Sequence, residues 1–338
     1  MTIRPALAAV FAATFLAAAP SQAADDLKVW FIDVEGGQAT LFLTPAGESV
    51  LVDAGWPGFG DRDAQRIAST AKAAGITAID YLLVTHFHMD HVGGVPGLVA
   101  KIPVKTFVDH GESIEKDAEG KKLFDAYVAV RDKGKHLIVK PGDKLPLKGV
   151  EWTIVSAGGK SLQQPLKGAG KPNPACKTFQ KREVNDDENG QSTGSFIQFG
   201  KFTTIDLGDL LWNKEEPLAC PNTKIPAVDV YITSHHGMNM SGSPAFVNMV
   251  HPKVAIMDNG ARKGGTAEAW DNQHAVPGIQ DIWQSHFAVE GGKAHNSPEN
   301  VIANVAETPD SGFSLKLVAH KDGHFEVSNG RNGYEKKY

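Results

Sequence analysis

Residues 85–94 read Thr-His-Phe-His-Met-Asp-His-Val-Gly-Gly and place four potential metal ligands within six residues: His86, His88, Asp90 and His91. They follow residues 79–84, a continuous apolar run typical of a buried strand. Imidazole and carboxylate groups are the ligands that hold zinc and similar divalent ions. A loop at a strand end can aim alternate side chains to one side, so we predict a metal site here. The ordered set argues against a histidine-rich surface loop.

Short apolar runs on both sides of this stretch indicate an α/β protein. A helix is expected at 61–74 because Ile67 and Ala71 share a face, and a long polar loop is expected at 158–193. The strands fall in two runs, each followed by helices, which indicates two packed sheets with helices outside. The other predicted helices are 115–131, 243–250 and 298–305, and the predicted strands are 27–34, 39–43, 49–52, 79–84, 104–108, 137–139, 151–155, 195–199, 202–207, 228–232, 254–257, 314–318 and 324–327.

The composition is that of a globular chain: 41% of the 338 residues are hydrophobic and 22% are charged. No repeat and no change of composition marks a linker, so we predict a single domain over residues 24–338. Residues 1–23 indicate an export signal, with Arg4 before an apolar stretch and Ser-Gln-Ala at the end. The apolar stretch is shorter than the ~20 residues of a bilayer span. We predict a periplasmic or secreted protein with no membrane span once the signal is removed.

The formal charge of −5 becomes −6 when Arg4 leaves with the signal. A mildly acidic chain has no general attraction to nucleic acid, so no strong nucleic-acid-binding signal is present. Several lysines between residues 160 and 182 are interpreted as a solvated loop. Cys176 and Cys220 could form one disulfide that pins this loop in an oxidising compartment. No feature of the sequence predicts an oligomeric state.

The quoted stretch resembles the HxHxDH signature of the metallo-β-lactamase superfamily, and further motifs follow in the family's order. Asp53-Ala54-Gly55 resembles the early DxG turn, Gly208-Asp209 resembles the metal-bridging GD, and 234–237, Ser-His-His-Gly, resembles the late histidine motif. The resemblance covers nearly all of the chain after residue 23. It implies a four-layer αββα sandwich with one or two metal ions at one edge of the sheets.

The resemblance also implies roles for these residues. Asp209 would bridge two metals, and either His235 or His236 would supply the last histidine. Adjacent side chains point apart on a strand, so we expect only one of the pair to face the metal and favour His235 slightly. Asp53 would lie behind a ligand and fix a histidine tautomer, although Asp before Gly is also ordinary turn chemistry. Catalysis would fall to Asp90 and His91.

One histidine of the family pattern is missing. Gln191 occupies the position where the third histidine of the first metal would be expected. A neutral amide oxygen binds zinc more weakly than imidazole does. The first position would then bind its ion loosely or borrow a ligand from a set of candidates: Asp186, Glu188, Asn189 or the second histidine of the 235/236 pair. The second position keeps Asp90, His91, Asp209 and one late histidine, and is the better supplied of the two.

This departure is similar to the ComEC-like and phosphorylcholine-esterase-like branch of the superfamily. Residues 33–39, Asp-Val-Glu-Gly-Gly-Gln-Ala, partly match that branch's early motif DVGQGDA. The late Gly-rich run at 259–265 departs from the branch's pattern, which argues against a DNA substrate. Weaker candidates for substrate binding are the residues of this run and one histidine at a strand end: Asn259, Arg262, Lys263 and His110.

The resemblance implies a metal-dependent hydrolase with a small-molecule or phosphoester substrate. A divalent ion lowers the pKa of its water from 15.7 towards about 7, which suits attack on a phosphoester or phosphodiester. Zinc is favoured as the metal, and manganese or iron stays open. Hydrolysis of a lactone, thioester or β-lactam is one alternative. A non-catalytic, metal-stabilised binding module is another, of a different class.

Overall fold

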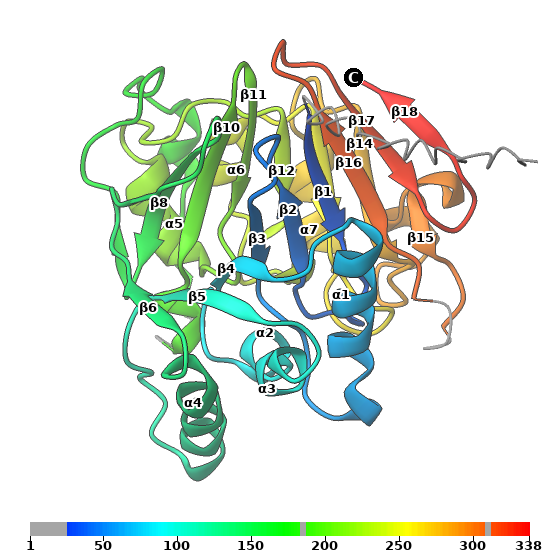
Figure 1. Ribbon diagram of the computed structural model, residues 1–338. Coiled ribbons are helices and arrows are strands. Elements are labelled where there is room, and N and C mark those ends of the chain that lie inside the picture. Colours follow the sequence, from blue (N-terminus) through cyan, green and yellow to red (C-terminus); the bar gives the residue numbers. More distant parts are fainter. Residues whose placement is uncertain (1–25, 183–186, 308–311) are drawn as a thin grey trace, which may run out of the picture.

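Two nine-stranded sheets face each other in the structure, a computed structural model that describes residues 26–182, 187–307 and 312–338 (Figure 1). The predicted export signal and Asp186 lie outside these residues. In the first sheet the strand order is β18-β17-β16-β1-β2-β3-β4-β5-β6. Its strands are β1 (Leu27–Phe31), β2 (Thr40–Leu43), β3 (Ser49–Val52), β4 (Ile79–Leu83), β5 (Val104–Asp109), β6 (Lys135–Ile138), β16 (Leu315–Ala319), β17 (Phe325–Asn329) and β18 (Glu335–Lys337).

The second sheet runs β15-β14-β13-β12-β11-β10-β8-β7, and β9 pairs with β8. Its strands are β7 (Lys144–Leu145), β8 (Glu151–Ala157), β9 (Lys160–Ser161), β10 (Gly194–Phe199), β11 (Phe202–Asp206), β12 (Val230–Ile232), β13 (Val254–Met257), β14 (Asp281–His286) and β15 (Ile302–Asn304). The α-helices are α1 (Arg62–Ala73), α2 (Met89–Val92), α3 (Val95–Val99), α4 (Ala118–Arg131), α5 (Trp212–Ala219), α6 (Pro244–Val250) and α7 (Ala267–His274).

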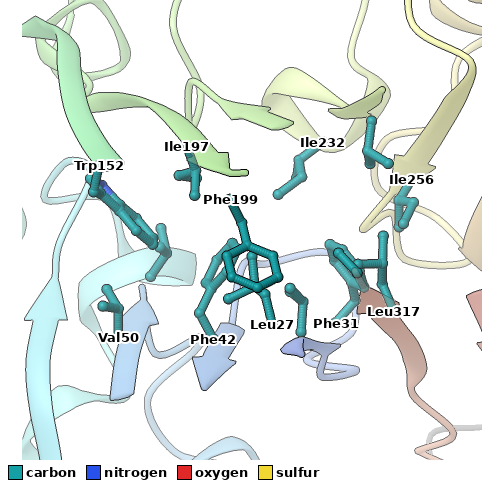
Figure 2. Packing of buried hydrophobic residues seen from close by; sticks show 14 of the residues in the cluster. Leu27, Phe31, Phe42, Val50, Trp152, Ile197, Phe199, Ile232, Ile256 and Leu317 are labelled. Carbon is teal, nitrogen blue, oxygen red and sulfur yellow. The ribbon is translucent and has the colours of Figure 1, made fainter. Parts of the chain in front are cut away.

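The largest apolar core lies between the two sheets. Phe42 of the first sheet meets Trp152 of the second edge-on, with ring centroids 4.9 Å apart. Figure 2 shows Leu27, Phe31 and neighbouring side chains of the first sheet pointing at Ile197, Phe199 and Ile256 of the second. Because every second residue of a strand faces the same side, these strands leave their other face for the helices.

Two further cores lie on the outer faces of the sheets. Buried residues of α1 and α3 pack on the first sheet, as does Tyr127 of α4. Figure 1 labels these three helices. Buried residues of α6 pack on the second sheet together with Leu218 of α5. The predicted four-layer αββα arrangement is therefore confirmed. No helix in the part of the chain described here is long and apolar enough to cross a bilayer.

Parallel pairing brings the motif loops to one edge. Strands β3, β4, β5 and β6 are mutually parallel, and so are β11 through β15. The motif residues follow the carboxyl ends of β3, β4, β11 and β12, the end at which open α/β sheets bind ligands. The topology therefore gathers motifs that are far apart in the sequence.

The helix predicted at 298–305 is wrong. Residues Glu299–Val301 form a 3₁₀ turn, and Ile302–Asn304 pair with β14 as strand β15. Val301 and Ala303 are buried in the core between the sheets, so packing against the sheet decides the conformation of this short apolar run. The sequence reasoning also missed α5, α7 and β14.

Candidate metal centre

Asp90, His91, Asp209 and His236 form a buried group whose potential ligand atoms all lie within 4.8 Å of one another. His236 Nε2 lies 3.1 Å from His91 Nε2, 3.2 Å from Asp90 Oδ2 and 3.4 Å from Asp209 Oδ1. His91 Nε2 lies 3.2 Å from a carboxylate oxygen of both aspartates. Two carboxylates and two imidazoles therefore point at a common centre.

The turn after β4 directs the first two of these side chains. His88 has extended backbone and precedes α2, whose single turn places Asp90 and His91 one after the other. Asp209 follows β11 through Gly208, which has a φ of 54°. A Cβ on Gly208 would lie 2.7 Å from the Cβ of Thr85, so only glycine lets the two loops approach this closely.

His236 enters the group because of an unusual backbone. His235 and His236 both have a φ of 54° within the 3₁₀ turn Ser234–Gly237, a left-handed conformation rare for residues with a Cβ. His235 lies beside the group, with Nε2 3.4 Å from Asp209 Oδ2 and Nδ1 3.2 Å from Ser241 Oγ. Both histidines therefore lie near Asp209, with His236 inside the group, because these residues form a turn and strand alternation does not apply to them.

Asp53 lies directly behind His91. Its Oδ2 lies 2.7 Å from His91 Nδ1 and accepts a hydrogen bond from the Thr85 hydroxyl, and its Oδ1 accepts one from the Thr85 backbone N–H. With Nδ1 engaged, His91 presents Nε2 to the two aspartates. Burial raises the pKa of Asp53, and the contacts with His91 and Thr85 act against that rise.

The charges in the group are strongly coupled. Burial acts to raise the pKa of Asp90 and Asp209, but the neighbouring histidines hold both well below the usual value. Burial in turn lowers the pKa of His236, but Asp209 and Asp258 outweigh it and raise that pKa to about 10. The buried carboxylates of Asp90 and Asp209 are therefore negatively charged. The positive charges beside them come from protonated histidines and from the Lys263 ammonium.

His86 lies next to this group, with its ring centroid 4.1 Å from that of His91. Within the described residues, His86 Nε2 is buried without a hydrogen-bond partner, and it lies 3.9 Å from Asp209 Oδ2. Burial holds the pKa of His86 well below its usual value. His88 is half-buried, with Nε2 3.5 Å from Glu115 Oε1. The two rings are in contact, with centroids 4.7 Å apart.

Asn189, and not Gln191, faces His88. Asn189 Oδ1 lies 2.9 Å from His88 Nδ1, whereas the Gln191 amide lies against Gly159. The reason is local: Glu188–Gln191 form a 3₁₀ turn, in which residues two apart point in different directions. The placement of Gln191 beside the ligands is therefore corrected, and one of the alternatives, Asn189, takes its place.

Glu188 holds this turn against the motif loop. Its fully buried carboxylate accepts hydrogen bonds from the backbone N–H groups of Phe87 and Ile114, at 3.3 and 2.9 Å. His110 Nε2 lies 2.9 Å from the same carboxylate. Burial acts to raise the pKa of Glu188, but the contact with His110 and the backbone donors lower it. His110 is thus a buried partner of Glu188 and not the substrate-side residue we expected.

Of the three candidates for substrate binding in the late glycine-rich loop, one contacts the group formed by Asp90, His91, Asp209 and His236. Asn259 is fully buried and donates to the carbonyl oxygens of Gly260 and His286, so its role is to shape the loop. Arg262 is exposed and paired with Glu307. Lys263 reaches the group: its ammonium contacts Asp90 Oδ2 and lies 4.9 Å from the centre of the Trp56 ring. Lys263 alone of the four substrate-side candidates therefore touches the cluster.

Trp56 and Lys263 also line a cavity of about 350 Å³ that continues to Arg262 and His286. His286 belongs to a second acidic group, with Nε2 2.7 Å from Asp33 Oδ1. Arg66 of α1 lies 3.0 Å from Asp33 and supplies positive charge there. This second group therefore links α1 and β14 to the loop that follows β1. Neither Trp56 nor His286 carried a motif that sequence reasoning could recognise.

The donor set fits a divalent cation. Imidazole and carboxylate are suitable ligand types, and among the described residues His86 Nε2 and Asp209 Oδ1 are buried polar atoms with no hydrogen-bond partner. A cation at this place would satisfy such atoms and neutralise the two aspartates. The residues that would hold it are Asp90, His91, Asp209 and His236.

Part of the chain is similar to known proteins. Residues 33–170 match the model of the Metallo-beta-lactamase superfamily. ComE operon protein 3 of Bacillus subtilis (strain 168) is 28% identical over 191 residues, which is 56% of this chain and 21% of that protein. The chain thus spans about a fifth of the length of this relative.

Solved structures with a related arrangement are distant in sequence. The metallo-beta-lactamase fold protein YhfI from Bacillus subtilis has a TM-score of 0.45 at 13% identity, covering 77% of this chain and 96% of its own. CmlA, a diiron β-hydroxylase from Streptomyces venezuelae, has a TM-score of 0.41 at 15% identity, covering 75% and 47%.

Proposed function

Because residues 33–170 match the model of the metallo-β-lactamase superfamily, we propose that the chain is a metal-dependent hydrolase acting on a phosphoester, first of all a phosphodiester. The observation that carries the proposal is the convergence of Asp90, His91, Asp209 and His236 beside the Lys263 ammonium. Zinc is the ion we favour, since the set combines imidazole and carboxylate; manganese and iron also accept these ligands.

The residues around the proposed ion have different roles. A divalent ion held by the group supplies a water acidified to a pKa of about 7 and an electrophile for the substrate. Asp90 orients the attacking water, and Asp53 keeps His91 Nε2 directed at the centre. Lys263, held against Trp56, binds an anionic oxygen of the substrate. Because Asp53, Asp90 and His91 are buried, their charges act with little screening by water.

The charge around the cluster supports an anionic substrate. Lys263 is about one-third exposed, so its ammonium can contact both Asp90 and a molecule in the adjoining cavity. Arg262 lines the same cavity. A phosphodiester carries its negative charge on the oxygens of the phosphorus atom that is attacked, whereas the carbonyl group attacked in a lactone, a thioester or a β-lactam is neutral. This difference favours the phosphoester among the predicted substrate classes.

We also propose that the protein works outside the cytoplasm, in the periplasm or as a secreted protein. Cys176 and Cys220 are joined by a disulfide, as the sequence suggested. Disulfides persist mainly in oxidising compartments, and this agrees with the predicted export signal at residues 1–23.

The test is a substrate screen with the purified protein and added Zn²⁺ or Mn²⁺. We expect hydrolysis of bis-p-nitrophenyl phosphate, abolished in Asp90→Ala, and little turnover of a chromogenic lactone or nitrocefin. Turnover of the lactone or nitrocefin instead would overturn the phosphoester assignment. Stoichiometric metal binding without turnover of any of the three would mean a binding module.

Lys263→Ala tests the substrate contact separately. Loss of a charge-assisted hydrogen bond should raise KM for the phosphodiester about ten-fold or more, with a smaller change in kcat. Lys105→Ala is the matched control, because Lys105 is an exposed lysine on β5 paired with Asp80 and should leave both constants unchanged. An unchanged KM in Lys263→Ala would remove Lys263 from the substrate site.

A further inference from the structure

Trp56 lines two cavities of the protein. One of them also holds Lys263 and has a volume of about 350 Å³. The other has a volume of about 390 Å³ and is bordered by the loop that carries Trp56 and by helices α1, α2, α3 and α4. Volumes of about 300–1,000 Å³ are typical of small-molecule sites. Apart from Trp56, the proposed function uses no residue that lines this second cavity, which we call the α4 cavity.

The lining of the α4 cavity is mostly apolar. Many of its residues are glycines or carry an apolar side chain, among them Met89, Val92, Pro96 and Leu123. Its charged residues are exposed and therefore reach water: Asp61, Glu119 and Lys122. A polar group that entered would lose hydrogen bonds to water and find few partners in exchange. The cavity therefore suits an apolar group.

Helix α2 places the α4 cavity next to the candidate metal centre. In this single turn Asp90 and His91 belong to the metal centre, whereas Met89 and Val92, on either side of them in the chain, line the cavity. One helical turn thus serves both places.

Trp56 is a second link between the α4 cavity and the metal centre. Its backbone N–H donates to Asp63 Oδ2 at 2.9 Å, which holds the loop before α1 in place. Its ring centre lies 4.9 Å from the Lys263 ammonium, which in turn contacts Asp90 Oδ2. A phosphate bound at Lys263 is therefore next to the aromatic ring that also lines the α4 cavity.

We propose that the α4 cavity binds an alkyl chain carried on one ester oxygen of the phosphodiester, while the phosphate lies at Lys263. The inference rests on the proposed function and narrows its substrate to an amphiphilic diester. The chain passes Trp56 and packs on the apolar side chains of α2, α3 and α4. A charged or sugar-like ester group is bound less well, because the lining offers it few hydrogen bonds.

A series of p-nitrophenyl alkyl phosphates with methyl, propyl and hexyl esters tests this, with release of p-nitrophenol measured in the presence of Zn²⁺. KM should fall by up to about four-fold for each methylene that enters the cavity. Ala126→Phe puts a ring into the cavity from α4. KM for the hexyl ester should then rise about ten-fold or more, with KM for the methyl ester unchanged.

Ala129→Phe is the matched control, because Ala129 is an exposed alanine of the same helix that does not line the cavity. It should leave the dependence on chain length intact. A KM that does not depend on chain length would overturn the inference while leaving the hydrolase proposal in place. So would a chain-length dependence that survives in a folded Ala126→Phe variant, with folding checked by circular dichroism.

Calorimetric titration with hexyl phosphate and methyl phosphate gives a reading that needs no turnover. If none of the diesters is hydrolysed, the proposed function fails and the titration alone decides on the cavity. Tighter binding of hexyl phosphate, lost in Ala126→Phe, would support the inference. Equal binding of the two phosphates, or no binding of either, would overturn it.

Discussion

Asp53 is a buried carboxylate that contacts His91, a member of the group formed by Asp90, His91, Asp209 and His236, without belonging to that group itself. It has a φ of 58°, an uncommon conformation for a residue with a Cβ, and this backbone directs its side chain to both Thr85 and His91. Positions of this kind are retained where the surrounding structure enforces them, often at functional sites. The residue therefore acts through the orientation of the imidazole.

Asp53→Asn should lower the zinc affinity of the group formed by Asp90, His91, Asp209 and His236 by about 10- to 100-fold, the usual effect of losing a hydrogen-bond partner behind a metal ligand. The reason is that an amide does not hold the His91 Nδ1 proton as a carboxylate does. Zinc titration measures the effect. Asp80→Asn is the control, because Asp80 accepts a hydrogen bond from the N–H of Ser49 outside the metal group. Equal affinities in Asp53→Asn and the unsubstituted protein would contradict the assigned role.

At the scale of elements, the buried carboxylate of Glu215 links helix α5 to the segment just before helix α6, on the outer face of the second sheet. Glu215 of α5 accepts hydrogen bonds from the N–H groups of Gly242 and Ser243, at 2.7 and 2.8 Å, just before α6 begins. Burial raises the pKa of Glu215 to about 7, although these two donors act against the rise. The same loop carries Ser241, the partner of His235, so the tie also supports the late histidine turn.

The raised pKa of Glu215 predicts a pH dependence of stability. Between the ordinary pKa of 4.5 and about 7, the folded state holds a proton that the unfolded state has lost. The free energy of unfolding should therefore fall as the pH rises through this range, by roughly 3 kcal/mol at most. Glu215→Gln should remove this contribution. Urea unfolding at pH 4.5, 6 and 7.5 gives the comparison, and parallel pH profiles of the two proteins would refute the prediction.

At the scale of the whole molecule, the core between the sheets holds the two halves of the metal group together. Asp90 and His91 come from the first sheet's loops, whereas Asp209 and His236 come from the second sheet's loops. Trp152 bridges the interface: it is fully buried, packs on Phe42 and donates from Nε1 to Ser195 Oγ at 2.8 Å. Metal geometry and sheet packing are therefore coupled.

Trp152→Ala should lower the free energy of unfolding by about 3–5 kcal/mol, since it leaves a large cavity and an unpaired hydroxyl. Trp152→Phe keeps most of the volume and should cost less. Urea denaturation followed by far-UV circular dichroism measures both. A loss below about 1 kcal/mol in the alanine variant would mean that other contacts hold the sheets together.

Local sequence was enough for most of the fold. Strands β3 and β13 match their predicted ranges residue for residue, because short apolar runs bounded by turn residues have few other conformations when buried. Prediction failed at β15, whose three residues are a strand only because β14 lies beside them. The neighbour, and not the local pattern, supplies the hydrogen bonds that decide between strand and helix.

At the group formed by Asp90, His91, Asp209 and His236, too, local sequence decides some features and tertiary contacts decide others. The spacing of His86, His88, Asp90 and His91 by itself determined that these side chains lie near one another, because residues within one turn after a strand cannot lie far apart. Only the tertiary structure brings His236 into the group with His235 beside it, and turns Asn189 instead of Gln191 towards His88. The physical reason is that these side chains arrive from loops more than a hundred residues away, where a left-handed backbone or a 3₁₀ turn sets their direction.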